Sequence, residues 1–357
     1  MSRYVAIMAG GVGSRFWPAS RQHRPKQFLD ILGTGKSLLR LTFERFLHLV
    51  PAQHIVIVTH QQYRALVQQE LPELDAHQIL CEPSRNNTAP CVAWVAFHLQ
   101  ALDPHANFVV APSDHFILKE QAFVEVLQRA LDFTEKHDAL LTLGIQPTRP
   151  DTGYGYIQYE PHAQEGVHKV VRFTEKPPLE QAQAYVASGH YLWNAGIFIW
   201  RAHTIINAFA QHAPDIYHIL EAGQQVYGTA AEAEFIAQHY PDTPNISVDY
   251  AIMERANNIY TLPADIGWSD LGTWASLHAL LDKDAHDNVL QGTHILAQEL
   301  RHSLVRLPEG KIAVLRGLDG FIVVDEGDVL LIWPKDDEQA IKQIRAEVGR
   351  RFGQDLL

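Results

Sequence analysis

The feature that most constrains the fold is an alternation of short apolar runs with longer stretches of helical periodicity, which extends from Tyr4 to Gly144. The short runs are rich in valine and isoleucine, which favours strands over helices. Helices of this length between strands predict right-handed crossovers and an α/β fold with a mainly parallel central sheet, covered on both faces. The expected strands are Tyr4–Met8, His54–Thr59, Gln78–Cys81, Phe108–Ala111 and Ala139–Gly144, and the expected helices are Leu38–Leu49, Gln61–Leu71, Ala89–Leu102 and Ala122–Lys136.

The pattern changes twice further along the chain. From about residue 151, three expected strands surround a helix, and helices then follow to about residue 240, which predicts a subdomain over about 151–262 that is inserted into the same sheet. After residue 284 the chain carries short β runs and a terminal helix. We therefore expect a main domain at 1–284 and a small β-rich C-terminal domain at 285–357 that ends in a helix. The expected elements are strands Tyr156–Tyr159, Lys169–Phe173, Trp193–Trp200, Ser303–Leu307, Ile312–Leu315, Phe321–Val324 and Val329–Ile332, with helices Leu179–Ser188 and Glu338–Arg350.

The C-terminal β runs show no clear repeat period and no low-complexity sequence. Open strand edges of this kind are usually covered in folded proteins. We therefore expect the tail to pack against the main domain or against a second subunit.

The charge balance limits the classes of partner. Lys and Arg number 29 against 41 Asp and Glu, a net charge of −12, which disfavours nucleic-acid and membrane-surface binding but allows small anionic substrates in a focused cleft. Only two cysteines occur, Cys81 and Cys91, without metal-ligand spacing, so a reduced, cytoplasmic protein is expected. No apolar stretch approaches the ~18 residues that a membrane span requires.

The stretch AGGVGSRFWPASRQHRPKQF, residues 9–28, follows the first expected strand and is typical of a phosphate-binding loop. It is not a dinucleotide fingerprint, because Phe16 stands where the third glycine is required. A Walker A motif ending at Gly35-Lys36-Ser37 also fails, because residue 30 is Asp30 rather than glycine. Residues 33–37 are instead predicted to form a turn in which Ser37 caps the next helix.

A different kind of phosphate loop remains. Glycines at 10, 11 and 13 allow backbone N–H groups to approach an oligophosphate, while Arg15 and Lys26 supply positive charge. The alternative is a plain glycine-rich turn followed by a solvated basic stretch.

The spacing G-G-x-G-S-R-x-x-P followed by R-P-K-Q resembles the sugar-1-phosphate nucleotidyltransferases. Within that family it is most similar to the mannose-1-phosphate guanylyltransferases, also called GDP-mannose pyrophosphorylases. The resemblance covers residue 3 to about 280, more loosely the tail, and rests on several motifs in the same order. It implies a Rossmann-like, glycosyltransferase-A-type nucleotidyltransferase domain.

The segment CEPSRNNTAP, residues 81–90, corresponds to the part of the family that meets the nucleobase. Glu82 could accept hydrogen bonds from N1–H and the N2 amine of guanine, and Asn87 and Thr88 could add polar contacts. The alternative is that Glu82 and Thr88 merely satisfy nearby backbone. The nucleotide-binding residues implied by the resemblance are Ala9, Gly10, Gly11, Gly13, Ser14, Arg15, Lys26, Glu82, Asn87, Thr88, Ser113 and Asp114.

Two acidic residues match the metal-binding positions of the family. Asp114 follows an apolar strand in VVAPSDHF, at the strand end where α/β sheets bind ligands. Asp270 lies in GWSDLGTW. By the resemblance the two carboxylates bind Mg²⁺, whereas a purely structural role would be the capping of a helix, which for Asp270 would run from Leu271.

Three further motifs, TGYGYIQ, FTEKP and WNAGIFIW, are assigned by the resemblance to the sugar-phosphate side. Taken singly, each of their polar residues would be expected on the surface or in a turn. The predicted sugar-phosphate residues are Gly155, Glu175, Lys176, Asn194 and, from SVDYAIMER, Asp249.

The resemblance implies that GTP and mannose 1-phosphate react to give GDP-mannose and diphosphate, without a covalent enzyme intermediate. Arg15, Lys26, Asp114, Lys176 and Asp270 are the predicted catalytic residues. Three alternatives remain: a related enzyme with a different base or hexose, a non-catalytic nucleotide-sugar-binding regulator, and a dinucleotide oxidoreductase, which the broken fingerprint disfavours. Longer relatives carry an isomerase-type cupin domain, which we do not expect here, and self-association is left open.

Overall fold

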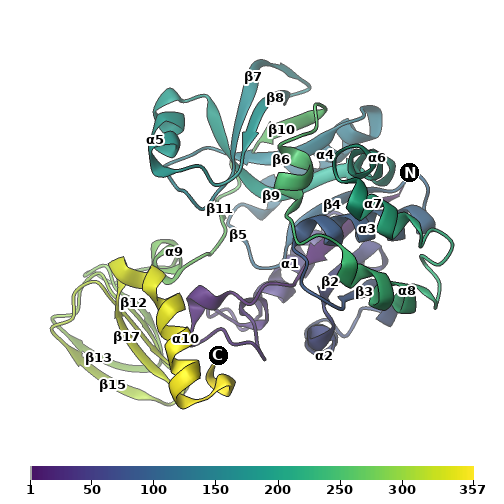
Figure 1. The fold of residues 1–357 in the computed structure, drawn as a ribbon. Helices are drawn as coiled ribbons and strands as arrows, with labels where there is room; N and C mark the ends of the chain where they lie inside the picture. The colour runs from purple at the N-terminus through teal and green to yellow at the C-terminus, as the bar shows by residue number, and fades with distance from the viewer. Residues whose placement is uncertain (1) are drawn as a thin grey trace. The chain divides into compact units, whose positions relative to one another are not determined.

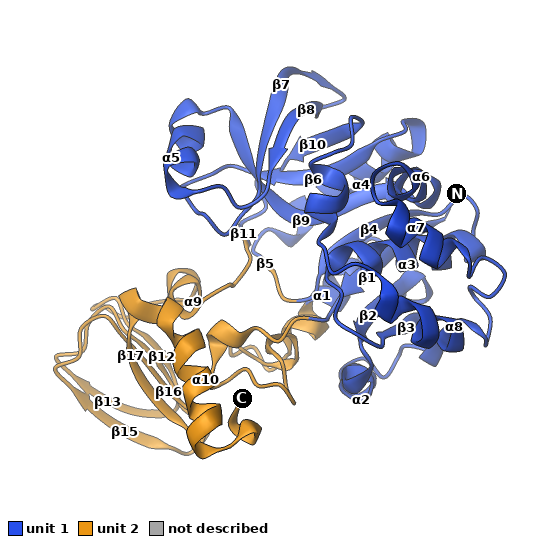
Figure 2. Cartoon of the chain, viewed as in Figure 1, with its two compact units in different colours: residues 1–10, 42–113, 117–268 blue, residues 11–41, 114–116, 269–357 orange. Residues whose placement is uncertain are grey.

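The computed structural model describes residues 2–357, which fall into two compact units that are interleaved in the sequence (Figure 2). Unit 1 comprises the chain up to Gly10, residues 42–113 and residues 117–268. Unit 2 comprises residues 11–41, 114–116 and 269–357. The predicted domain boundary near residue 284 stays a prediction. The two compact units divide the chain differently, because residues 11–41 belong to the same unit as the C-terminal tail.

Unit 1 is built on a nine-stranded sheet in the order β3-β2-β1-β4-β9-β6-β10-β8-β7 (Figure 1). The five strands expected before residue 145 all form, each within two residues of its predicted ends. The strands are β1 (Arg3–Met8), β2 (Ile55–His60), β3 (Ile79–Glu82), β4 (Asn107–Pro112), β6 (Leu140–Ile145), β7 (Tyr156–Gln164), β8 (Val167–Thr174), β9 (Tyr191–Arg201) and β10 (Ile259–Pro263).

The α/β fold class is confirmed, but the sheet is mixed rather than mainly parallel. Strands β3, β2, β1 and β4 are parallel, as is the β6–β10 pair. β9 lies between β4 and β6 and runs antiparallel to both. Its largely apolar sequence is typical of a parallel strand that is buried on both faces, so the composition of β9 does not reveal its antiparallel direction.

Helices cover both faces of this sheet because the strands are apolar on both sides. α3 packs against the face that carries Ala6, Val56 and Val110, in one core with α6 and α7. α4 contacts β4, β6 and β9. The helices that lie wholly in unit 1 are α2 (Arg64–Glu70), α3 (Thr88–Leu102), α4 (Glu120–Lys136), α5 (Leu179–Ser188), α6 (Ala202–His212), α7 (Pro214–Glu221) and α8 (Glu232–His239), with a π-helical turn at Asp249–Met253.

Unit 2 contains a short parallel β-solenoid. Strands β12 (Val289–Gln291), β14 (Leu304–Arg306) and β16 (Phe321–Asp325) form one parallel ladder, which β17 (Leu330–Pro334) extends antiparallel, and β13 (His294–Gln298) pairs in parallel with β15 (Ile312–Arg316). Successive coils repeat the backbone register, since Val289 pairs with Leu304 and Leu304 with Ile322. The sequence shows no clear repeat period because the coils differ in length: Val289 and Leu304 lie 15 residues apart, whereas Leu304 and Ile322 lie 18 apart.

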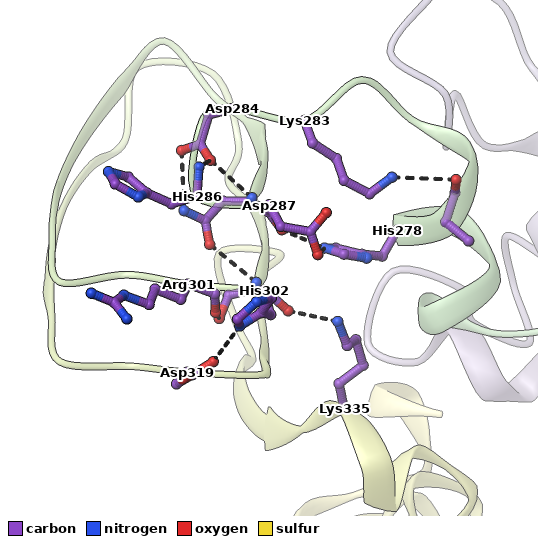
Figure 3. A network of polar contacts seen from close by, with 12 residues as sticks. His278, Lys283, Asp284, His286, Asp287, Arg301, His302, Asp319 and Lys335 are labelled. Atoms are coloured by element: carbon purple, nitrogen blue, oxygen red, sulfur yellow. Dashed lines mark hydrogen bonds and ion pairs between the residues drawn. The ribbon is translucent and has the colours of Figure 1, made fainter.

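A polar network braces the first turn of this solenoid (Figure 3). His278 Nε2 lies 2.8 Å from the carbonyl oxygen of Asp287, and Lys335 Nζ donates to the carbonyl oxygen of His302 at 2.6 Å. Asn288 Nδ2 donates to Asp284 Oδ2 at 3.0 Å. These bonds hold the loops at this end of the coil.

The tail and the segment 11–41 share one hydrophobic core within unit 2. Phe16 and Trp17 pack in it with Trp274, Ile322 and Ile341. The expected packing of the tail on the catalytic segment is therefore confirmed for residues 11–41. The remaining elements of unit 2 are the 3₁₀ turns Ser14–Phe16 (η1), Lys26–Phe28 (η2), Lys335–Ala340 (η8) and Gln354–Leu356 (η9), and the helices α9 (Trp274–Leu280) and α10 (Ile341–Phe352).

Three short elements join the units along the chain. α1 (Leu38–Phe46) runs from one to the other, and β5 (Phe116–Ile117) pairs with β11 (Trp268–Ser269). Ser37 caps α1 as predicted, because its Oγ accepts from the backbone N–H of Arg40 at 3.1 Å. Among residues 2–357, no helix combines the length and apolar character needed to cross a bilayer.

Candidate active site

Unit 2 contains a cavity of about 390 Å³ at the glycine loop. Six of the predicted site residues, drawn from three distant segments of the sequence, line it together. The lining residues are Gly13, Ser14, Arg15, Lys26, Asp114, His115, Asp270, Gly272 and Lys342.

The glycine loop is shaped by the approach of Lys26. Gly13 has φ 69°, in the left-handed region, and a Cβ at this position would lie 2.5 Å from Cβ of Lys26. The backbone N–H of Lys26 donates to the carbonyl oxygen of Val12 at 3.3 Å. Only glycine can adopt this dihedral angle and leave room for Lys26 at residue 13. The backbone of the loop and the position of the Lys26 side chain therefore depend on each other.

Lys26 brings the two predicted metal-binding segments together. Its side chain is 3% exposed, and Nζ lies 3.0 Å from Asp114 Oδ2 and 3.0 Å from the carbonyl oxygen of Asp270. Burial alone would raise the pKa of Asp114, but the charges of Lys26 and His115 outweigh it and hold that pKa below its usual value. The carboxylate is therefore ionised at neutral pH, as a cation ligand must be.

Asp270 is not the cap of the following helix. α9 begins at Trp274, and its N-cap is Thr273, whose side chain accepts from the backbone N–H of Ser276 at 3.2 Å. Oδ1 of Asp270 accepts from the backbone N–H of Gly272 at 3.0 Å. A Cβ at residue 272 would lie 2.6 Å from Asp270 Oδ2, so this glycine leaves room for the carboxylate beside the cavity.

Three lining residues were not predicted from the sequence: His115, Gly272 and Lys342. Lys342 lies in the first turn of α10, at the far end of the chain from the glycine loop. The sequence signals only that the terminal helix is amphipathic, and this periodicity does not identify the segment against which the helix packs.

Glu82 lies in unit 1, where it is 7% exposed at the end of β3. Its Oε1 accepts a short hydrogen bond from the hydroxyl of Tyr240, whereas Oε2 lies 3.5 Å from where a Cβ on Gly10 would stand. Burial raises the pKa of Glu82 to about 7, although the Tyr240 bond and the charge of Arg85 oppose the shift. One carboxyl oxygen is thus occupied, and the other faces a glycine.

Four other predicted nucleotide-binding residues of unit 1 form hydrogen bonds to other groups of the protein. The carbonyl oxygen of Ala9 accepts from Thr59 Oγ1 at 2.8 Å, and that of Ser113 accepts from Thr42 Oγ1 at 3.0 Å. Asn87 Oδ1 accepts from the backbone N–H of Thr88 at 2.9 Å and caps α3. Thr88 Oγ1 accepts from the backbone N–H of Val248 at 2.9 Å. In unit 2, Gly11 is exposed and has no neighbour within 4 Å of an added Cβ.

The predicted sugar-phosphate residues form two linked pairs in unit 1. Lys176 Nζ lies 2.9 Å from Glu175 Oε1, and the hydrogen bond and charge of Glu175 raise the pKa of Lys176 against the effect of burial. Glu175 Oε2 is buried and has no hydrogen-bond partner among residues 2–357. A Cβ on Gly155 would lie 2.6 Å from this oxygen, so glycine is needed there.

The second pair joins Asn194 to Asp249. Asn194 Nδ2 donates to Asp249 Oδ1 at 3.0 Å, and Asn194 Oδ1 accepts from Thr142 Oγ1 at 2.8 Å. Burial, followed by the charge of Glu175, raises the pKa of Asp249. Asp249 opens the π-helical turn, a backbone form that is frequent at functional sites. Thr142, which orients Asn194, was not identified from the sequence.

The nucleotidyl transferase family model matches residues 4–287. The Salmonella typhimurium mannose-1-phosphate guanylyltransferase RfbM is 35% identical over 351 residues, which make up 96% of this chain and 72% of its own length. The alginate biosynthesis protein AlgA of Pseudomonas fluorescens is 37% identical over 95% of this chain and 70% of its own.

Among solved structures, the chain is similar to the Thermus thermophilus protein described as a mannose-1-phosphate geranyltransferase. The two superpose with a TM-score of 0.88 at 31% identity, over 98% of this chain and 99% of that one. The family model covers most of the chain, and the sequence relatives match nearly all of it. The protein is therefore an enzyme of the nucleotidyl transferase family, similar over almost its whole length to the mannose-1-phosphate guanylyltransferases.

Proposed function

We propose that the protein converts GTP and α-D-mannose 1-phosphate into GDP-mannose and diphosphate. The observation that carries this proposal is the cavity of unit 2, in which cationic side chains and two carboxylates surround a glycine loop. Its substrates follow from the similarity to relatives named mannose-1-phosphate guanylyltransferase. A cytoplasmic location is part of the proposal and is supported by the two free cysteines.

The reaction is an in-line displacement at the α-phosphorus of GTP. A phosphate oxygen of mannose 1-phosphate forms the new bond to this phosphorus, and the bond to the bridging oxygen of the diphosphate breaks. Lys176 holds the sugar phosphate, while the loop amides, Arg15 and Lys26 neutralise the departing diphosphate. Positioning and charge stabilisation account for most of the catalysis in such phosphoryl-type transfers.

The carboxylates of Asp114 and Asp270 suit Mg²⁺, which prefers oxygen ligands and completes its shell with water and substrate phosphates. They line the same cavity, and the depressed pKa of Asp114 keeps that ligand charged. Two carboxylates leave the other coordination positions to water and to nucleotide phosphate oxygens. Residues 2–357 contain no group of three or more candidate ligand side chains. When bound, Mg²⁺ supplies Lewis-acid neutralisation of phosphate oxygens. Asp114→Asn and Asp270→Asn keep the shape of the side chain but remove its charge, so each variant should fold and lose most of its turnover. If one variant keeps the wild-type rate at limiting Mg²⁺, the residue substituted in that variant is not a metal ligand.

We assign the selection of guanine over other nucleobases to Glu82. Its Oε2 faces Gly10 and accepts no hydrogen bond from residues 2–357, so it is available to the N1–H or N2 amine of guanine. When Glu82 is ionised, adenine, which presents an acceptor at N1, would leave the buried carboxylate unsatisfied, and this disfavours ATP above the pKa of Glu82. GTP should be strongly preferred over ATP, and Glu82→Gln should relax the preference without changing the binding of mannose 1-phosphate.

The test is the measurement of kcat/KM for GTP, ATP and ITP with the wild type and with Glu82→Gln. Efficient use of ITP by the wild type, with full discrimination against ATP in the variant, would exclude Glu82.

The decisive experiment for the whole proposal is a diphosphate-release assay across a grid of nucleoside triphosphates and hexose 1-phosphates. The proposal predicts the highest kcat/KM for GTP with mannose 1-phosphate. A maximum at another pair would assign the chain to a related sugar-nucleotide synthesis. Binding of substrates without release of diphosphate would instead support a regulatory role.

A further inference from the structure

We propose that Lys342 of the C-terminal helix is a further phosphate-binding residue, which contacts the diphosphate portion of the nucleotide and the diphosphate released from it. The inference deepens the proposed function and rests on it for the identity of the nucleotide. It gives the terminal helix a direct part in substrate binding.

The first observation is the fixed position of Lys342 beside the glycine loop. The neighbouring Ile341 is fully buried in the core that contains Phe16 and Trp17, and α10 contacts η1, the turn that carries Arg15. Just before the helix, Glu338 Oε2 accepts from the backbone N–H of Ala275 at 2.8 Å. These contacts hold the backbone of the first turn of α10 against the loop.

The second observation is the charge balance of the cavity. Three cationic side chains, those of Arg15, Lys26 and Lys342, share the lining with the carboxylates of Asp114 and Asp270. Lys26 is already paired with Asp114. Lys342 is exposed and has no ion-pair partner in the described chain, residues 2–357. Its ammonium group is therefore available to an anion in the cavity.

The alternative is that Lys342 is an ordinary solvated lysine on the outer face of a helix. Such a residue would leave the affinity for diphosphate unchanged, because exposed charges away from the ligand are screened. A residue that contacts the anion must change that affinity in a charge-dependent manner. The two cases are therefore separated by direct binding of diphosphate.

The experiment compares four full-length proteins: the wild type, Lys342→Ala, Lys342→Arg and the control Arg350→Ala. Arg350 is an exposed cation in the last turn of the same helix and does not line the cavity, so its removal matches the change in net charge. Binding of inorganic diphosphate is measured by calorimetry with Mg²⁺ at low and at moderate ionic strength. KM is then measured separately for GTP and for mannose 1-phosphate.

We expect Lys342→Ala to weaken diphosphate binding about fivefold, the scale of an exposed charged contact, with a smaller effect at higher salt. KM for GTP should rise while KM for mannose 1-phosphate stays constant. Lys342→Arg should retain most of the affinity, and Arg350→Ala should behave as the wild type.

The inference is overturned if the wild type and Lys342→Ala bind diphosphate equally, if the wild type binds none, or if Arg350→Ala causes the same loss. Failure of the proposed function gives a different result. A wild type that binds diphosphate through Lys342 but does not use GTP with mannose 1-phosphate would refute the substrate assignment and retain the phosphate contact.

Discussion

Glu82 shows how burial at a single residue controls both charge and stability. The carboxyl group is 7% exposed, and its pKa is raised from 4.5 to about 7 because the charged form is poorly solvated. Folding therefore favours the protonated form. The wild type carries no penalty below pH 4.5, where the group is neutral in both states, and acquires the penalty as the pH rises towards 7.

We accordingly expect Glu82→Gln to stabilise the protein at pH 8 by up to about 3 kcal/mol, and to have little effect at pH 5. The amide oxygen can still accept the hydrogen bond from Tyr240, so the packing is kept. Urea unfolding at the two pH values measures the difference. An equal change at pH 5 and pH 8 would mean that the charge of Glu82 is not the cause.

The two candidate phosphate-binding lysines should act on different substrates. Lys26→Ala removes a charge from the glycine-loop cavity and should impair the use of GTP, whereas Lys176→Ala should weaken mannose 1-phosphate. Each lost charged contact should cost about 1.5–3 kcal/mol in the corresponding kcat/KM. Steady-state kinetics with each substrate varied in turn measures this, and each variant is the control for the other. Equal effects of both variants on both substrates would contradict the division.

At the scale of the element, the sequence predicted local structure better than strand direction or long-range pairing. The strands β1 to β4 and β6 were found from their apolar composition, and the Ser37 cap was found from residue type and position. The antiparallel direction of β9 and the solenoid of the tail were not predicted. The direction of β9 depends on which distant strands it pairs with, and the solenoid coils differ in length, so they leave no fixed period in the sequence.

Two glycine-to-alanine substitutions in the glycine loop, at residues 13 and 11, test the role of its backbone conformation. Gly13→Ala should destabilise the protein by at least about 1–2 kcal/mol, because alanine is strained at φ 69° and its Cβ would lie 2.5 Å from that of Lys26. Gly11→Ala has open space around the added Cβ and should leave the free energy of unfolding nearly unchanged. Thermal unfolding of both variants tests the prediction. Equal stability of the two would show that the backbone at Gly13 adapts without strain.

At the scale of the whole molecule, the sequence predicted most of the residues that line the glycine-loop cavity but not Lys342. Arg15, Lys26, Asp114 and Asp270 were predicted from motifs in a known order, and the structure places them around one cavity. Lys342 carries no motif. Its place depends on the packing of α10 against the segment 11–41, which is a tertiary contact between the two ends of the chain.

Because the tail shares this core with the segment 11–41, which carries the predicted catalytic residues Arg15 and Lys26, truncation after Asp284 should abolish activity. The core around Phe16, Trp17, Leu29 and Ile31, each at most 8% exposed in the intact chain, keeps Leu271, Trp274 and Leu277 but loses its members from the tail, which are Val289, Leu304, Ile322, Val324, Leu331 and Ile341. Exposure of such side chains costs about 1.5–3 kcal/mol each, which is enough in sum to unfold the loop that carries Lys26 or to cause aggregation.

A shorter deletion provides the control for that experiment. Removal of residues 353–357 takes away only the end of the tail and two hydrogen bonds. Trp17 Nε1 donates to the carbonyl oxygen of Leu356 at 2.8 Å, and the backbone N–H of Gln22 donates to the carbonyl oxygen of Leu357 at 2.6 Å. It leaves the solenoid and Ile341 in place, so we expect a lower melting temperature with turnover largely retained. Light scattering and diphosphate release on both truncated proteins measure the outcome. If the protein cut after Asp284 stayed monodisperse with full turnover, the segment 11–41 would hold its fold without the tail, and the shared core would have no part in catalysis.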